Sequence, residues 1–79
     1  MKLELKELRN KRSLTQEQLA RLCEDWLISV NSETRCSTQK ISRLEQNRFE
    51  YLERHLIDAL CAVLNCKSGD LIKNEGAKP

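Results

Sequence analysis

Glycine, proline and aromatic residues are scarce in this sequence of 79 residues. It contains two glycines and one proline, and aromatic residues make up 4% of it. So few turn-forming residues leave little room for the many tight turns of an all-β domain. Leucine-rich segments with charged residues between them instead favour an all-α fold. The length suffices for one domain and not for two.

Long apolar runs and a strong charge imbalance are also missing. No apolar run approaches the roughly 18 residues of a transmembrane helix, and residues 1–12, MKLELKELRNKR, are too charged for a secretory signal. We therefore expect a cytoplasmic protein without a membrane partner. The formal net charge is +2, from 14 basic and 12 acidic residues. A nucleic-acid surface would therefore have to come from local clustering of charge.

The cysteines lack the close pairing that is typical of zinc sites. The four of them, at positions 23, 36, 61 and 66, are widely spaced, and His55 is the only histidine. Their even number is compatible with disulfides, but without a signal peptide we expect reduced thiols. We interpret the cysteines as structural or incidental, with a metal site and a disulfide as less favoured alternatives. We predict no metal and no cofactor.

Apolar residues recur at helical spacing in five stretches of the chain. These stretches predict helices over residues 2–12, from residue 16 through Cys23, and over residues 38–46, 52–64 and 68–72. Packed together, they form a compact all-α domain of five helices over residues 1–73. The segment 74–79 is predicted to be a disordered tail.

Capping signals mark the ends of several of these helices. Thr15, followed three residues later by Gln18, matches a capping box. Ser37 is a suitable N-cap for the third helix. Asn47 and Asn65 tolerate the left-handed conformation that often ends a helix.

The second and third predicted helices have the layout of a helix-turn-helix. Ala20 is a small residue in the middle of the second helix, and it allows the third helix to cross closely. In the third helix, Ile41 and Leu44 are spaced to face the core. The other side chains between residues 37 and 48 are all of hydrogen-bonding types. Most of these side chains could reach a nucleic acid.

On these residues the sequence resembles the phage repressor and Cro type helix-turn-helix family, often called the Xre family. The likeness covers about residues 3–72, nearly the whole chain. The resemblance implies a repressor-like domain that places its third helix in the major groove of DNA. The matching residues are Leu5, Leu8, Arg9, the segments LTQEQLA (14–20) and ISRLE (41–45), Ile57, Leu60 and Leu64.

The resemblance also implies roles for individual polar residues. Gln16 corresponds to a glutamine that grips a DNA phosphate, and a helix N-terminus already attracts anions. Arg9 and Glu45 occupy the positions of a partly buried, structural ion pair. Contacts to bases are implied for Thr38, Gln39, Lys40, Ser42 and Arg43, and contacts to backbone phosphates for Gln16, Gln46, Asn47 and Arg48.

The link between the second and third helices is roughly eleven residues longer than the motif requires. The insert covers residues 24–36 and has three alternative interpretations. The favoured one lengthens the second helix, with Trp26 and Leu27 covering the core. The insert would otherwise form a surface for a partner or a second copy. The third alternative is a set of phosphate contacts through Asn31, Ser32, Thr34 and Arg35.

The leading interpretation is a sequence-specific, double-stranded-DNA-binding transcriptional regulator, most simply a repressor. An enzyme is not expected, because the sequence has no nucleophile–base pair and no phosphate-binding glycine-rich loop. The fourth helix has more apolar residues than one core face needs, namely Leu52, Leu56 and Val63. They predict a homodimer that forms through the C-terminal helices. Such a dimer would read a palindromic operator. The alternative function is a protein–protein interaction module on the same fold, using the Trp26 insert.

Overall fold

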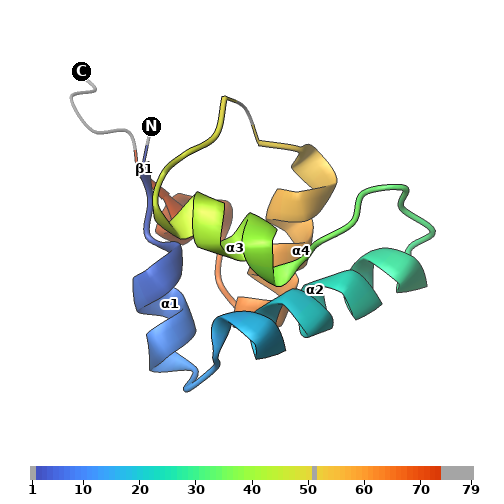
Figure 1. Ribbon diagram of the computed structural model, residues 1–79, viewed down its shortest axis with the longest axis horizontal. Helices are drawn as coiled ribbons and strands as arrows, with labels where there is room; N and C mark the ends of the chain where they lie inside the picture. Colours follow the sequence, from blue (N-terminus) through green and yellow to red (C-terminus); the bar gives the residue numbers. More distant parts are fainter. Residues whose placement is uncertain (1, 51, 74–79) are drawn as a thin grey trace.

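The computed structural model describes residues 2–50 and 52–73, and this part of the chain folds into helices joined by loops (Figure 1). The all-α prediction with five helices is confirmed, and the predicted tail over residues 74–79 lies outside the described residues. The elements are β1 (Lys2–Leu3), α1 (Leu5–Lys11), α2 (Gln16–Ser29), α3 (Thr38–Glu45), α4 (Arg54–Leu64), α5 (Ser68–Leu71) and β2 (Ile72–Lys73).

A two-stranded ladder joins the two ends of the described chain. β1 and β2 are antiparallel, with Leu3 opposite Ile72. The first helix therefore begins at Leu5, and the prediction of a helix from residue 2 was wrong. The backbone groups before Leu5 have other partners, because Leu3 N–H donates to Asn47 Oδ1 at 2.9 Å and Glu4 N–H donates to the Leu71 carbonyl at 2.8 Å.

The predicted caps are present at the helix ends. Thr15 Oγ1 accepts from the Gln18 backbone N–H at 3.0 Å, and Gln18 Oε1 accepts from the Thr15 N–H at 2.9 Å. Ser37 Oγ accepts from the backbone N–H of the third residue of α3 at 3.1 Å. Asn47 and Asn65 have φ angles of 58° and 52°. These short-range signals fix where α2 and α3 begin and where α3 and α4 end.

The first half of the insert lengthens α2, as the favoured interpretation states. α2 runs to Ser29, Leu27 is fully buried, and Trp26 is half-buried and packs against the core. Asn31 takes a left-handed φ of 57° just after the helix, and the Ser32 N–H donates to the Leu27 carbonyl at 2.9 Å. Only residues 30–37 are left as a connecting loop.

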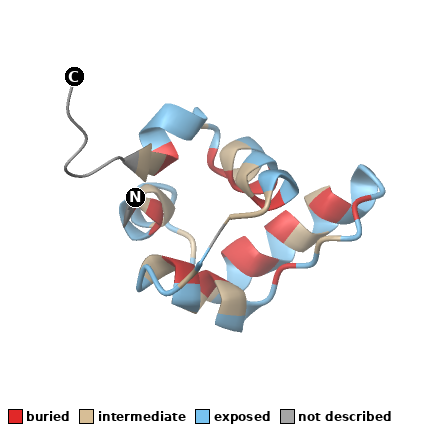
Figure 2. Ribbon diagram, turned by 90° about the horizontal axis from the view of Figure 1, so that it is seen from above, coloured by how far each residue is buried: buried red, intermediate tan, exposed pale blue. Residues whose placement is uncertain are grey.

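The core lies where α2 packs against α3 and α4 (Figure 2). Leu56 is 1% exposed and belongs to this core, so its assignment to an exposed flank of α4 was wrong. Leu52 and Val63 are half-buried against the same core. The buried apolar residues are Leu3, Leu5, Leu19, Ala20, Cys23, Leu27, Cys36, Ile41, Leu44, Leu56, Ala59, Leu60, Leu64 and Leu71.

Three large apolar side chains on α2 and directly after it are exposed. They are Leu22, Ile28 and Val30, among the residues that the structure describes. In the same part of the chain, no helix combines the length and the apolar character needed to cross a membrane.

Candidate nucleic-acid interface

α3 presents a continuous polar face on the side opposite its buried residues. Ile41 and Leu44 hold the helix on the core and are almost fully buried. Residues spaced three, four and seven apart share one side of a helix. By that spacing the outward face consists of Gln39, Ser42, Arg43 and Gln46. On it, Gln46 Nε2 donates to Ser42 Oγ at 3.2 Å.

Two of the five predicted base-contacting residues lie beside this face and not on it. Lys40 is one helical turn before Leu44, and its Nζ lies 3.3 Å from Glu53 Oε1, in the segment before α4. Thr38 lies at the opposite side of α3, where it lines a cleft against α2. The fold therefore brings Gln39, Ser42 and Arg43 together, and it directs Lys40 and Thr38 to the two flanks.

The predicted phosphate-contacting residues lie near the C-terminal end of α3. Gln16 is the first residue of α2, and its Nε2 donates to Glu45 Oε1 at 2.9 Å. Asn47 is exposed but also has a structural role, because its Oδ1 accepts the Leu3 N–H. Arg48 is exposed just beyond the end of α3.

An ion pair between Arg9 and Glu45 joins α1, α2 and α3. Arg9 donates through Nε and Nη2 to the two carboxylate oxygens, and through Nη1 to the Leu14 carbonyl at 2.8 Å. The side chains of Arg9 and Glu45 are only 12% and 5% exposed. Burial alone would raise the pKa of Glu45, but the hydrogen bonds from Arg9 and Gln16 hold it below its ordinary value. The pair raises the pKa of Arg9.

A second polar network ties the 30–37 loop to α4, and no local pattern in the sequence indicates it. The Ser32 hydroxyl and His55 Nδ1 share a hydrogen bond of 2.9 Å, and Ser32 is 6% exposed. Thr34 Oγ1 donates to Glu53 Oε2 at 3.0 Å. Hydrogen bonds from Thr34 and then Lys40 lower the pKa of Glu53. Of the four proposed phosphate contacts in the insert, Ser32 and Thr34 are thus engaged in the fold.

The other two proposed phosphate contacts of the insert, Asn31 and Arg35, are exposed. Arg35 Nη1 donates to the carbonyl groups of Ser32 and Thr34 at 2.8 and 3.1 Å. The guanidinium therefore holds its own loop in shape. A contact from Arg35 to DNA would use its remaining donors.

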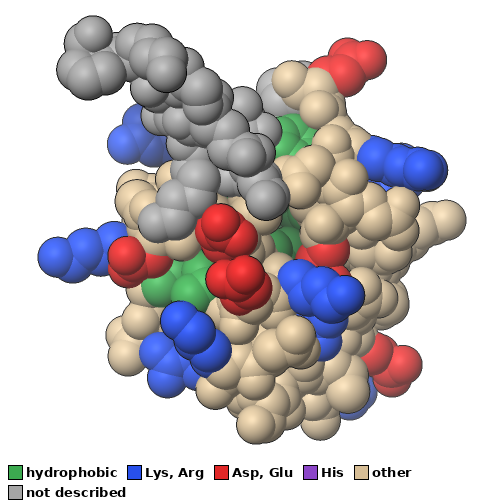
Figure 3. Space-filling view, turned by 90° about the vertical axis from the view of Figure 1, so that its left-hand side faces the viewer, with side chains coloured by type: hydrophobic (Ala, Val, Ile, Leu, Met, Phe, Trp, Pro, Cys, Tyr) green, Lys and Arg blue, Asp and Glu red, His purple; other side chains and the backbone are tan. Residues whose placement is uncertain are grey.

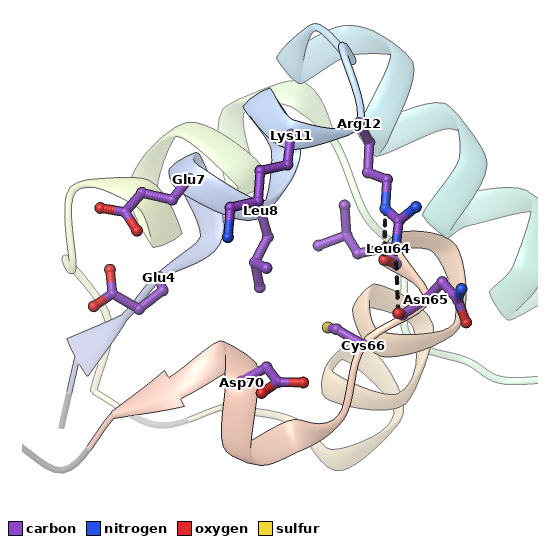
Figure 4. A pocket seen from close by; sticks show the side chains of 9 residues that line it. All are labelled: Glu4, Glu7, Leu8, Lys11, Arg12, Leu64, Asn65, Cys66 and Asp70. Carbon is purple, nitrogen blue, oxygen red and sulfur yellow. Dashed lines mark hydrogen bonds between the residues drawn. The ribbon is translucent and has the colours of Figure 1, made fainter.

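A cleft of about 560 Å³ separates α1 from the turn between α4 and α5 (Figure 4). Arg12 crosses one end, where its Nε donates to the Leu64 carbonyl at 3.0 Å and stabilises the C-terminus of α4. The carboxylates of Glu4, Glu7 and Asp70 also line this cleft, and they would repel phosphate. Acidic and basic side chains are interspersed on the side of the molecule that carries α1 (Figure 3).

The two packed helices α2 and α3, with a polar outward face on the second, define a helix-turn-helix domain. A sequence model of one such family, described as the Cro/C1-type HTH DNA-binding domain, matches residues 4–76. The chain belongs to this family, and the predicted resemblance is confirmed. It is a DNA-binding domain by that membership. Comparison with curated proteins and with solved structures finds no match.

Proposed function

We propose that this protein is a cytoplasmic transcriptional regulator, most simply a repressor, that places α3 in the major groove of double-stranded DNA. The proposal is supported mainly by the polar outward face of α3. The opposite side of the same helix is buried in the core. Gln39 has the paired donor and acceptor that suit adenine, and Arg43 has the fork of donors that suits guanine. Ser42 lies between them and can donate or accept.

Phosphate contacts near the C-terminal end of α3 would orient the helix. A primary amide has two N–H donors, so Gln16 can give one to Glu45 and the other to a phosphate. The N-terminus of α2 adds its own attraction for an anion. At the same end of α3, contacts to neighbouring phosphates are proposed for Gln46, the amide nitrogen of Asn47 and Arg48.

Lys40 and Thr38 have a weaker claim to base contact than the three outward residues. The Lys40 ammonium must leave Glu53 before it can reach a base, although an exposed pair of this kind is easily broken. We therefore assign the main part of the sequence preference to Gln39 and Arg43, with Lys40 and Thr38 at the edges of the contact.

Homodimerisation through the C-terminal helices and a palindromic operator stay predictions. Of the three apolar residues that predict this surface, Leu56 is in the core. The alternative function, a protein-binding module, is favoured by a different observation, namely the exposed Leu22, Ile28 and Val30 of α2 and its end. Sedimentation at micromolar concentration, with and without operator DNA, separates a monomer from a dimer.

The decisive test is selection of bound genomic DNA fragments, followed by titration of the best site at several salt concentrations. The variants are Gln39→Ala/Arg43→Ala and, as a charge-matched control on α4, Arg54→Ala. We expect the double variant to keep weak, salt-dependent binding and to lose about 1–3 kcal/mol of discrimination for each contact removed. The control should keep the wild-type preference. If no sequence is enriched, or if the double variant selects the wild-type site, the proposal fails.

A further inference from the structure

The fold brings the four cysteines together in two pairs, although the sequence separates them. Cys23 of α2 and Cys36, which lies directly before the Ser37 cap of α3, are buried in the same core. Ala20 and Glu24, on either side of Cys23 in α2, line the same cleft as Cys36. Cys61 of α4 and Cys66 are joined through the backbone, because the Cys66 N–H donates to the Cys61 carbonyl at 3.0 Å. All four side chains are free thiols.

The surroundings of Cys36 suit a reactive thiol. Its residue is only 3% exposed, but it lines an open cleft of about 510 Å³ between α2 and the start of α3. A small oxidant can therefore approach Cys36 through the cleft. Arg21 and Arg35 line the same cleft, together with Glu17 and Glu24. Cys36 also lies at the N-terminal end of α3, where a thiolate is stabilised.

The two pairs differ in the acidity of their thiols. The hydrogen bond from Cys23, assisted by Lys40, lowers the pKa of Cys36, although burial and Glu24 oppose this. The same contact raises the pKa of Cys23. In the second pair, burial raises the pKa of Cys61 to about 11 and also raises that of Cys66. Thiolates react faster than thiols, so the second pair should react more slowly than the first. It therefore serves as an internal control.

We propose that a peroxide oxidises Cys23 and Cys36 to an intramolecular disulfide, and that this disulfide weakens DNA binding. The second half of this proposal rests on the proposed function, whereas the first half concerns the thiols alone. Cys36 would be the attacking thiol because it lines the cleft, and Cys23 would be the resolving thiol because it is buried beside it.

The reaction has two steps. The Cys36 thiolate attacks one peroxide oxygen, so that an S–O bond forms, the O–O bond breaks, and the leaving hydroxide takes a proton to become water. The Cys23 sulfur then attacks the Cys36 sulfenic acid, an S–S bond forms, the S–O bond breaks, and the leaving hydroxide takes the Cys23 proton. The two thiols lose two protons and two electrons, and one hydrogen peroxide is reduced to two waters.

The disulfide would shift the start of the DNA-reading helix. Two sulfurs in contact lie roughly 3.5–4 Å apart, whereas a disulfide bond is about 2.05 Å long. Closing this gap draws Cys36 toward α2, and Gln39 follows three residues later in the chain. Specific contacts need their groups within about 0.5 Å of the productive geometry. A shift of this size therefore removes contacts at the first turn of α3.

The test uses the full chain with Cys61→Ser/Cys66→Ser, which keeps only the Cys23–Cys36 pair, and the reverse chain with Cys23→Ala/Cys36→Ser. Each is exposed to hydrogen peroxide, then examined by intact mass, thiol titration and affinity for the selected DNA site. Circular dichroism checks that both fold, and single Cys36→Ser and Cys23→Ala variants replace the reverse chain if it does not.

In the chain with the Cys23–Cys36 pair, we expect a mass loss of about 2 Da and the disappearance of both thiols. DNA affinity should fall by about tenfold or more, equivalent to one lost base contact, and should return on reduction with dithiothreitol. The reverse chain should keep its mass, its thiols and its affinity under the same exposure.

Each contrary result overturns a stated part of the proposal. Unchanged mass, or faster oxidation of Cys61 and Cys66, refutes the assignment of the reactive pair. A disulfide that leaves DNA affinity unchanged refutes its regulatory effect. If the reduced protein binds no DNA, the proposed function fails, and mass and thiol titration still decide whether the pair is oxidised.

Discussion

Removing the buried Glu45 carboxylate should destabilise this domain far more than breaking the exposed ion pair between Lys40 and Glu53 does. In Glu45→Ala, Arg9 keeps its charge in a site where its side chain is 12% exposed, and it loses two hydrogen bonds. Gln16 loses a third. Breaking a buried pair from one side costs about 3–5 kcal/mol, and the residual exposure of Arg9 favours a value of about 3 kcal/mol. A domain of this size has roughly 4–12 kcal/mol of stability in total.

Urea unfolding monitored by circular dichroism measures this loss, with Lys40→Ala as the control. Lys40 and Glu53 form an ion pair whose side chains are 41% and 38% exposed, so breaking it should cost less than about 1 kcal/mol. The variant Arg9→Met/Glu45→Leu removes both charges and should recover most of the loss. If Glu45→Ala costs no more than Lys40→Ala, the argument that burial makes this pair important is refuted.

The same pair predicts a pH dependence. Its environment lowers the pKa of Glu45 in the folded protein relative to the ordinary value of 4.5. A depressed carboxyl pKa stabilises the fold fully above the ordinary value, and the contribution disappears as pH falls through the lower, folded-state value. Wild type should therefore lose stability on acidification below about pH 4.5 more steeply than Arg9→Met/Glu45→Leu does, and parallel curves would contradict this account.

Two further predictions concern residues whose roles differ from those first expected. Leu56→Ala should lower the free energy of unfolding by about 2–5 kcal/mol, because the side chain is buried, whereas a position on an exposed flank would change it by about 0.5 kcal/mol or less. Asn47→Ala should cost about 1–3 kcal/mol, because it removes the acceptor for the Leu3 N–H and places alanine at a φ of 58°. Asn47→Gly should cost less than Asn47→Ala in the same thermal unfolding assay, and equal values would show that backbone conformation is unimportant there.

The features that the sequence predicted correctly depend on short-range rules. The capping box at Thr15 and the cap at Ser37 involve groups three residues apart, so their spacing is visible in the sequence. The inward spacing of Ile41 and Leu44 likewise fixes which side of α3 faces outward. The same spacing places Lys40 one turn before Leu44. The sequence alone therefore indicates that Lys40 points to the flank of α3 and not along its outward face.

The features that were missed join distant parts of the chain. Ser32 and His55 are 23 residues apart, and Leu3 and Asn47 are 44 apart, and no local pattern indicates either contact. Leu56 was misassigned because α4 is apolar on two sides, and spacing alone does not tell which side meets a neighbouring helix. The pairing of Cys23 with Cys36 depends in the same way on how the loop returns from α2 to α3.

The β1–β2 ladder has a mechanical consequence for α3. Its outermost pair is Lys2 and Lys73, so tension applied to the two ends of the described chain opens the ladder one pair at a time, like a zipper. The next pair contains Leu3, whose N–H is bonded to Asn47 at the end of α3. Because Leu3 is also buried in the core, a pull on residues 2 and 73 acts on the end of α3 and on the core through the same pair. Proteins fused to both ends would therefore load the end of α3 through the Leu3–Asn47 hydrogen bond.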